Sequence, residues 1–252
     1  MGKIACITGA TSGIGYYSAI EFAKLGYNLI ITGRRKERLE NIEKELKENY
    51  NIKVLSQNFD VRERTSVEDS LNSLPSEWKE IDVLLNNAGL AAGKEPIFDG
   101  DYKDWDQMID TNIKGLLYVS RVIIPWMKER KQGHIINICS IAGKEIYKDG
   151  AVYCASKAAV NSISQGMRID CNPFNIKVTN ICPGAVETEF SMVRFKGDKE
   201  KVDATYHGYT PLTGEDIAKT ILYCATLPSH VCINDLVITP TAQANATTFH
   251  RE

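Results

Sequence analysis

The sequence predicts an α/β fold of the doubly wound type, in which helices cover both faces of a mostly parallel sheet. Two observations predict it: short apolar, β-rich runs recur along the chain, and longer segments with helical periodicity separate them. Right-handed crossovers between parallel strands place consecutive helices against such a sheet. Because the 252 residues show no internal repeat or linker, residues 1–252 are predicted to form a single domain.

Seven apolar runs are short enough to be buried strands. They span residues 3–8, 28–32, 53–59, 82–85, 134–139, 177–182 and 236–239. The segments with helical periodicity span residues 13–25, 36–49, 62–74, 104–131, 151–171 and 214–227. The least periodic region, residues 187–214, is polar and punctuated by glycine, which predicts a long loop that binds the substrate.

Composition excludes several classes of function. The 30 Lys and Arg residues nearly balance the 32 Asp and Glu residues, so nothing recruits nucleic acid electrostatically. The seven cysteines are dispersed without a Cys-x-x-Cys pair, and the four histidines are scattered, so we expect no metal site. No run approaches the ~18 apolar residues of a membrane span and no signal-peptide pattern opens the chain, so we expect a cytoplasmic protein that does not bind membranes.

A glycine-rich turn follows the first predicted strand and opens the first predicted helix. Its glycines let the backbone turn tightly and approach phosphate groups, while the free N–H groups and the positive end of the helix attract them. This position predicts the pyrophosphate site of a dinucleotide. The residues that we expect there are Gly9, Thr11, Ser12, Gly13, Ile14 and Gly15.

Two arginines follow the second predicted strand, where an NAD site carries a carboxylate for the ribose 2′-hydroxyl. The sequence places Arg34 and Arg35 there, with no acid until Glu37. Because the planar guanidinium binds phosphate bidentately and keeps its charge, this pair favours the 2′-phosphate of NADP(H). Cations at the start of a helix oppose its dipole, which argues against a purely structural role.

Tyr153 and Lys157 lie one helical turn apart on the predicted helix 151–171. Reduction of a carbonyl needs a proton donor, but free tyrosine has a pKa near ~10, far above neutral pH. A nearby ammonium stabilises the phenolate and lowers that pKa, and it can also hydrogen-bond the nicotinamide ribose. The pair therefore predicts an acid/base catalyst.

Polar residues follow two further strands at the same edge of the sheet, where ligands of open α/β folds bind. Ser140 follows the strand 134–139, and Asn86-Asn87-Ala88-Gly89 ends the strand 82–85. Asn112 lies on the next predicted helix. The Ser140 hydroxyl is placed to donate to a substrate oxygen.

Together these motifs resemble the short-chain dehydrogenase/reductase family in order and spacing. The motifs that carry the resemblance are Thr8-Gly-x-x-x-Gly-Ile-Gly15, Asn86-Asn-Ala-Gly89, Asn112, Ser140, Tyr153-x-x-x-Lys157 and Pro183-Gly184. The resemblance spans the whole chain and implies a Rossmann-type sheet of about seven parallel strands.

The resemblance also implies roles for individual residues. Tyr153 is the proton donor and acceptor, and Ser140 orients and polarises the carbonyl. Lys157 tunes the tyrosine, and Asn112 anchors a water-linked proton relay. The further cofactor contacts that it implies are Asp60 and Val61 beside adenine, Asn87 near the adenosine ribose, Pro183, Gly184, Val186, Thr188 and Ser191 at the nicotinamide end, and Ala88 and Gly89.

Within the family, loop segments resemble those of NADP-dependent 3-hydroxy acid dehydrogenases. The segments are residues 33–39, 188–197 and 227–234. This likeness implies a short 3-hydroxy acid such as serine, allo-threonine or 3-hydroxyisobutyrate as substrate. The carboxylate of such a substrate needs a cation, and Arg194 in the predicted loop is the nearest candidate by placement, with Glu95, Tyr147 and Tyr206 as further candidates for the pocket.

Two other interpretations stay open. One is an NADPH carbonyl reductase of broad specificity in the same family, and the other is an NADP-sensing protein without catalysis. The family resemblance further implies a homodimer or homotetramer, assembled on the long helices around Asn112 and Tyr153, with the tail 239–252 as a possible contributor.

Overall fold

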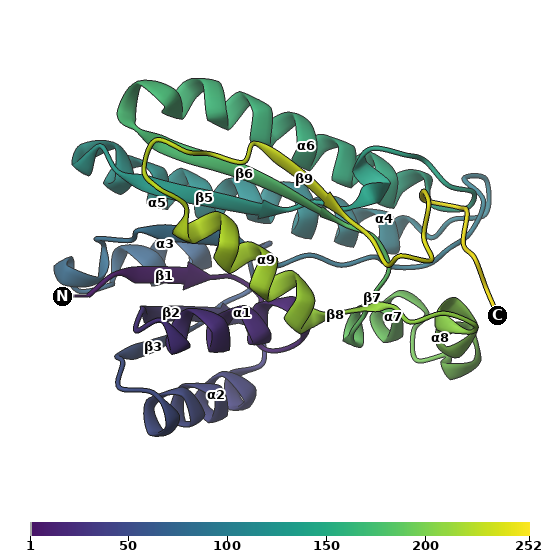
Figure 1. Ribbon diagram of the computed structural model, residues 1–252, viewed down its shortest axis with the longest axis horizontal. Coiled ribbons are helices and arrows are strands. Elements are labelled where there is room, and N and C mark those ends of the chain that lie inside the picture. The colour runs from purple at the N-terminus through teal and green to yellow at the C-terminus, as the bar shows by residue number, and fades with distance from the viewer. Residues whose placement is uncertain (1) are drawn as a thin grey trace.

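Seven parallel strands form the central sheet of the computed structural model, which describes residues 2–252 (Figure 1). The strands are β1 (Ile4–Ile7), β2 (Asn28–Gly33), β3 (Val54–Asn58), β4 (Val83–Asn86), β5 (Gly133–Ile138), β6 (Ile176–Pro183) and β9 (Asp235–Ile238). Their order across the sheet is β3-β2-β1-β4-β5-β6-β9. Every predicted strand is confirmed, with ends shifted by at most one residue.

Helices cover both faces of the sheet, as the alternating pattern predicted. They are α1 (Gly13–Lys24), α2 (Lys36–Asn49), α3 (Arg64–Asn72), α4 (Tyr102–Ile109), α5 (Leu116–Arg130), α6 (Ala151–Cys171) and α9 (Gly214–Thr226). Figure 1 shows α1, α2 and α9 on one side of the sheet and α3 to α6 on the other. Each face of the sheet has its own hydrophobic core, and successive residues of a strand point into the two cores alternately. Ile7 and Ile31 pack with α1, whereas Cys6 and Ile30 pack toward α3 and α5.

The segment 187–214 differs from the predicted loop. It contains two short helices, α7 (Glu189–Arg194) and α8 (Lys199–Tyr206), and a two-stranded parallel sheet of β7 (Val186–Glu187) and β8 (Leu212–Thr213). Thr188 caps α7 by accepting the N–H of Phe190, and Asp198 caps α8 by accepting the N–H of Lys201. Because these helices bury almost no side chains, they leave no apolar periodicity in the sequence.

The strand order reverses between β1 and β4, which are neighbours in the sheet. From β1 the chain proceeds to β2 and β3 on one side, and the later strands lie on the other. This switch point opens a crevice at the carboxyl ends of β1 and β4, where ligands of doubly wound folds bind. Across residues 2–252, no helix is both long and apolar enough to cross a membrane, and no group of three His, Cys, Asp or Glu side chains is arranged to hold a metal.

Candidate active site

A cleft of about 1000 Å³ runs along the carboxyl edge of the sheet. It brings together nearly all of the residues that the sequence predicted for cofactor and substrate. Those lining it are Gly9, Thr11, Ser12, Gly13, Ile14, Arg34, Arg35, Asp60, Val61, Asn87, Ala88, Gly89, Ser140, Tyr153, Lys157, Pro183, Gly184, Val186, Thr188, Ser191 and Arg194. Gly15 and Asn112 stand behind this lining.

The glycine-rich turn forms one end of the cleft. Gly9 and Gly13 adopt positive φ angles of 67° and 52°, a conformation that favours glycine. A Cβ on Gly15 would lie 2.4 Å from the Gly9 carbonyl oxygen, so this glycine permits the close packing of α1 on the turn. Thr8 Oγ1 accepts the N–H groups of Asn87 and Ala88, both at 3.0 Å, and ties the turn to the end of β4.

Arg35 lies over this turn. Its Nε and Nη2 donate to Thr11 Oγ1 at 3.1 and 2.8 Å, and Nη2 also donates to Ser12 Oγ at 2.9 Å. Its Nη1 pairs with Glu189 Oε2 at 2.7 Å, and Arg38 Nη1 pairs with the other carboxylate oxygen at 2.7 Å. Sequence reasoning missed Arg38 and Glu189, because their contact joins residues 151 positions apart.

Arg34 remains available at the rim of the cleft. Its side chain is 52% exposed, and its nearest acid is Asp60, at 3.8 Å from Nη1. Asp60 is occupied by Arg62 at 2.7 Å; although partial burial raises the pKa of Asp60, the hydrogen bonds from Arg62 hold it below its ordinary value. The side of the cleft next to β2 therefore carries an excess of guanidinium groups, which suits a phosphate.

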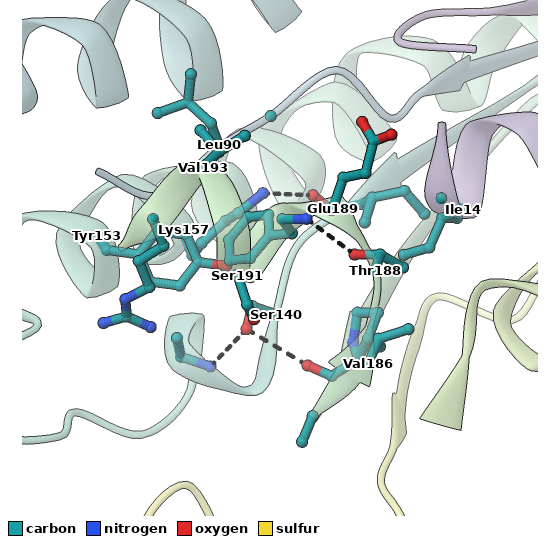
Figure 2. A pocket seen from close by; sticks show the side chains of 18 of the residues that line it. Ile14, Leu90, Ser140, Tyr153, Lys157, Val186, Thr188, Glu189, Ser191 and Val193 are labelled. Carbon is teal, nitrogen blue, oxygen red and sulfur yellow. Dashed lines mark hydrogen bonds between the residues drawn. The ribbon is translucent and has the colours of Figure 1, made fainter. Parts of the chain in front are cut away.

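Ser140, Tyr153 and Lys157 gather at the other end of the cleft, as Figure 2 shows. Ser140 follows β5, and its Oγ accepts the N–H of Ala142 at 3.1 Å and donates to the carbonyl of Pro183 at 3.4 Å. Tyr153 and Lys157 project from the first two turns of α6, and both are buried. Ser140 is thus held at a fixed position beside the phenol.

Lys157 makes its hydrogen bond to the backbone rather than to the tyrosine. Its Nζ donates to the carbonyl of Ile138 at 2.9 Å and lies 6.0 Å from the centre of the Tyr153 ring. Burial lowers the pKa of this ammonium. Since an ammonium has three donors, the bond to Ile138 leaves two for other partners.

The pKa of Tyr153 corrects one expectation. Burial raises it above its ordinary value, and the Tyr147 phenol adds to this, while Ser140 and the charge of Arg194 act in the opposite direction. The sequence predicted a pKa lowered by Lys157, but the desolvation of the phenol outweighs the groups that lower its pKa. The phenol is therefore protonated at neutral pH.

Asn112 lies in a π-helical turn, residues Asp110–Gly115, inserted between α4 and α5. Its Oδ1 accepts the N–H of Leu90 at 2.8 Å, and its Nδ2 donates to the Leu90 carbonyl at 2.8 Å and to Ser156 Oγ at 3.0 Å. The predicted helix 104–131 is thus continuous in extent but not uniformly α-helical. The side chain fastens the loop after β4 to α6, and the proton relay stays a prediction.

Arg194, at the end of α7, lies beside Tyr153. Its guanidinium carbon lies 5.7 Å from the Tyr153 ring centre and 5.2 Å from that of Tyr147. The Nε and Nη2 atoms of Arg194 and the hydroxyl of Tyr147 are all buried, and none has a hydrogen-bond partner within residues 2–252. Buried polar groups of this kind normally have partners, so the arrangement fits an anionic ligand.

Comparison with known proteins agrees with this geometry. Residues 3–199 match the family model of short chain dehydrogenases. The chain belongs to the short-chain dehydrogenase family. Over 244 residues it is 49% identical to the NADP-dependent 3-hydroxy acid dehydrogenase of Salmonella typhi, covering 96% of this chain and 97% of that one.

Two further relatives of this short-chain dehydrogenase extend the comparison. Sulfoacetaldehyde reductase 2 of Chromohalobacter salexigens is 44% identical, with 97% of this chain and 96% of the relative covered. The closed form of serine dehydrogenase complexed with NADP+ superposes with a TM-score of 0.92 at 46% identity, covering 99% of this chain and all of the other.

The C-terminal tail of the dehydrogenase packs on its own chain. Gln243 is buried, and its Oε1 accepts the N–H of Ala185 at 2.8 Å. The Arg251 guanidinium stacks on Tyr209 and Phe249 and donates to carbonyls of α8 and the residue after it. The tail therefore supports the rim of the cleft from within the same subunit.

Proposed function

We propose that this chain is an NADP-dependent dehydrogenase of short 3-hydroxy acids, of the serine, allo-threonine and 3-hydroxyisobutyrate class. The observation that carries the substrate class is the pair of buried nitrogens of Arg194, Nε and Nη2, which have no hydrogen-bond partner within residues 2–252 and lie beside Tyr153. The 49% identity to an NADP-dependent 3-hydroxy acid dehydrogenase supports both cofactor and substrate.

The residues of the cleft fit NADP(H) from end to end. The glycine turn with Thr11 and Ser12 offers N–H and hydroxyl donors to the pyrophosphate. Arg34 and Arg35 would hold the 2′-phosphate, and Asp60 and Val61 would flank the adenine. Pro183, Gly184, Val186 and Thr188, together with the free donors of Lys157, would hold the nicotinamide riboside.

The bound cofactor supplies or accepts the hydride, and the chain's own groups handle the proton. In reduction, Tyr153, which its raised pKa keeps protonated at neutral pH, donates its phenolic proton to the carbonyl oxygen. Ser140 exchanges its long 3.4 Å bond to Pro183 for one to the substrate oxygen and so stabilises the developing alkoxide. In oxidation, the same phenol accepts the proton, and the charges of Lys157 and Arg194 stabilise the phenolate.

Arg194 would bind the carboxylate of the substrate. In a 3-hydroxy acid a single carbon separates the carboxylate from the reacting carbinol carbon, which matches a guanidinium next to the catalytic phenol. Its Nε and Nη2 form the fork that binds a carboxylate bidentately. Burial raises the pKa of Tyr147 to about 12, so its hydroxyl remains a donor to the same group.

Steady-state kinetics test the proposal. Turnover of L-serine, L-allo-threonine, 3-hydroxybutyrate and 3-hydroxyisobutyrate is measured with NADP+ and with NAD+. Replacement of Arg194 by Gln is expected to lower kcat/KM for these acids about 10- to 100-fold, since hydrogen bonds to a charged group contribute roughly 1.5–3 kcal/mol. Tyr147→Phe, which removes one hydroxyl, is expected to have a smaller effect.

A neutral substrate and a remote arginine provide the controls. The ethyl ester of 3-hydroxybutyrate should respond little to Arg194→Gln, and Arg64→Gln, on the exposed face of α3, should leave every substrate unaffected. Equal losses for acid and ester would contradict carboxylate recognition. Preferred reduction of neutral ketones would favour the broad carbonyl reductase, whereas preferred reduction of sulfoacetaldehyde would favour a sulfonate as the anion.

We also propose that the protein is a homodimer or homotetramer of a reducing compartment, the cytoplasm. Large apolar side chains are exposed on the helices around Asn112 and Tyr153, namely Tyr102, Ile109, Leu117 and Ile169. All seven cysteines carry free thiols. Light scattering tests the assembly, and a monomer at micromolar concentration would contradict it.

A further inference from the structure

Glu189 joins the cofactor side of the cleft to the helix that carries Arg194. Its two carboxylate oxygens pair with different arginines of the α2 region, Oε2 with Arg35 and Oε1 with Arg38, each at 2.7 Å. Arg35 is itself fixed by three hydrogen bonds to Thr11 and Ser12. The carboxylate therefore bridges two guanidiniums that belong to a well-anchored part of the molecule.

The helix α7 is short enough for this contact to matter at its far end. Glu189 is its first residue and Arg194 its last, so about 7.5 Å of helix separates them at 1.5 Å per residue. Between them, the ring of Phe190 packs edge to face on Tyr153, with 5.8 Å between ring centres. A displacement at Glu189 would shift both the ring that covers the catalytic phenol and the guanidinium beside it.

Few other contacts hold α7 in place. Within it only Ser191 is buried, and its hydroxyl bonds to Tyr206 of the neighbouring α8 at 2.6 Å. At the end of the helix, the Arg194 carbonyl accepts the N–H of Gly93 at 3.0 Å. Single exposed ion pairs contribute only about 0.2–1 kcal/mol, yet at such a loosely packed helix the two pairs of Glu189 form a large share of the attachment.

We propose that Glu189 is a positioning residue that fastens α7 to Arg35 and Arg38, and thereby holds Arg194 in the orientation that binds the substrate acid. The inference rests on the proposed function for its substrate. Arg38 is remote from the reacting atoms, but through its contact with Glu189 and α7 it influences how tightly the substrate acid binds.

A double-mutant cycle tests the proposal. Glu189→Gln, Arg38→Gln and the double variant are compared with wild type for oxidation of the best 3-hydroxy acid at saturating NADP+. Glu189→Gln, which breaks both pairs, is expected to raise KM about two- to fivefold, and Arg38→Gln, which breaks one, somewhat less. The double variant should be no worse than Glu189→Gln alone, and kcat should stay within about twofold, because Ser140, Tyr153 and Lys157 are untouched.

The control is Glu187→Gln, two residues before Glu189. Glu187 is exposed and makes no ion pair within residues 2–252. The KM of the Glu187→Gln variant for the 3-hydroxy acid should therefore equal that of wild type. An unchanged KM in Glu189→Gln, or effects that add in the double variant, would overturn the proposal. So would tighter NADPH binding with an unchanged KM, since the carboxylate would then be a competitor of the 2′-phosphate.

Limited trypsin digestion separates this inference from the proposed function. The segment after Glu189 offers cleavage sites at Arg194, Lys196, Lys199 and Lys201. Faster cleavage there in Glu189→Gln and Arg38→Gln, but not in Glu187→Gln, is expected whatever the substrate proves to be. Equal cleavage in all four proteins would overturn the attachment, whereas failure of every 3-hydroxy acid would overturn only the proposed function.

Discussion

The end of the cleft that holds Ser140, Tyr153 and Lys157 is built by different means from the segment 187–214. Ser140 follows β5, every residue of which is buried, and Tyr153 and Lys157 stand on α6. By contrast, α7 has one buried residue and α8 has none among the residues described. Caps and ion pairs, rather than a core, hold the second region.

This difference assigns different tasks to the two regions. Acid/base chemistry requires atoms held within a few tenths of an ångström, which close packing provides. Substrate binding and release require a part that moves, and such parts come from the less stable regions of a protein. The region proposed to bind the substrate is thus separable from the region proposed to carry out the reaction.

Hydrogen exchange tests the contrast most directly and has the largest expected effect. Amides of β1, β4 and β5 should exchange only on global unfolding, and those of α7 and α8 by local opening, with protection lower by on the order of 10⁴-fold. Similar protection in both regions would contradict the distinction. Addition of NADP+ should slow exchange in α7.

Substitution of Tyr153 by Phe tests the buried catalytic end. Removal of the hydroxyl takes away the proton donor without changing the packing of the ring, so kcat should fall about 10²- to 10⁴-fold. NADPH binding, followed by fluorescence, and the melting temperature should stay close to wild type. Retained turnover would exclude the assigned mechanism, whereas NADPH binding without turnover in the wild-type protein would support the NADP-sensing interpretation.

The arginines next to β2 provide a test at the cofactor end, with an intermediate effect. Arg34→Ala and Arg35→Ala each remove charge-assisted bonds to the 2′-phosphate, so each should lower the preference for NADP+ over NAD+ about 10- to 100-fold in kcat/KM. Arg35→Ala should also raise the KM of the acid, because Glu189 loses a partner. An unchanged preference in both variants would contradict the site.

A buried histidine in the sheet makes the stability of the fold depend on pH, and this is the smallest of the expected effects. Burial, aided by the charge of Lys177, lowers the pKa of His134 on β5 to about 3 from an ordinary 6.5. Below pH 6.5 this histidine binds a proton in the unfolded chain but not in the native protein. It therefore lowers the free energy of unfolding as the pH falls from 6.5 toward 3.

Urea unfolding of wild type and His134→Gln at pH 7.5 and 5.5 measures this contribution. The histidine variant should lose less stability than wild type over that interval, by on the order of 1 kcal/mol. The hydrogen bond of His134 to Thr179, at 2.7 Å, makes the variant less stable at both pH values. The change in unfolding free energy between the two pH values, rather than its absolute value at either pH, therefore measures the contribution of His134.

The regular part of the molecule was predictable because its signals are local. Buried strands appear as short apolar runs, and Tyr153 and Lys157 share a helix face through their spacing alone. Ser140 and the Asn86-to-Gly89 motif meet because parallel strands end at one edge of the sheet. These inferences needed no knowledge of side-chain contacts between distant segments.

The remainder depends on contacts that span the chain. Tyr147 and Arg194 meet only because an aperiodic segment folds back over α6, and Glu189 reaches Arg38 across 151 positions. Thr188 and Asp198 could have indicated the two short helices as N-caps, but neither helix has the apolar stripe that would confirm one. Whether the pKa of Tyr153 is raised or lowered depends on the burial of the phenol, which the spacing of residues in the sequence does not show.

The π turn at Asn112 makes this part of the site sensitive to length as well as to composition. Each residue of an α-helix advances the chain by about 100° around its axis. Deletion of one residue within 110–115 would allow a regular helix but would rotate either Asn112 away from Leu90 or the apolar face of α5 away from the sheet. A library of single-residue deletions should therefore show intolerance here where many substitutions survive, so a designer who transplants this site must copy the irregular turn along with the side chains.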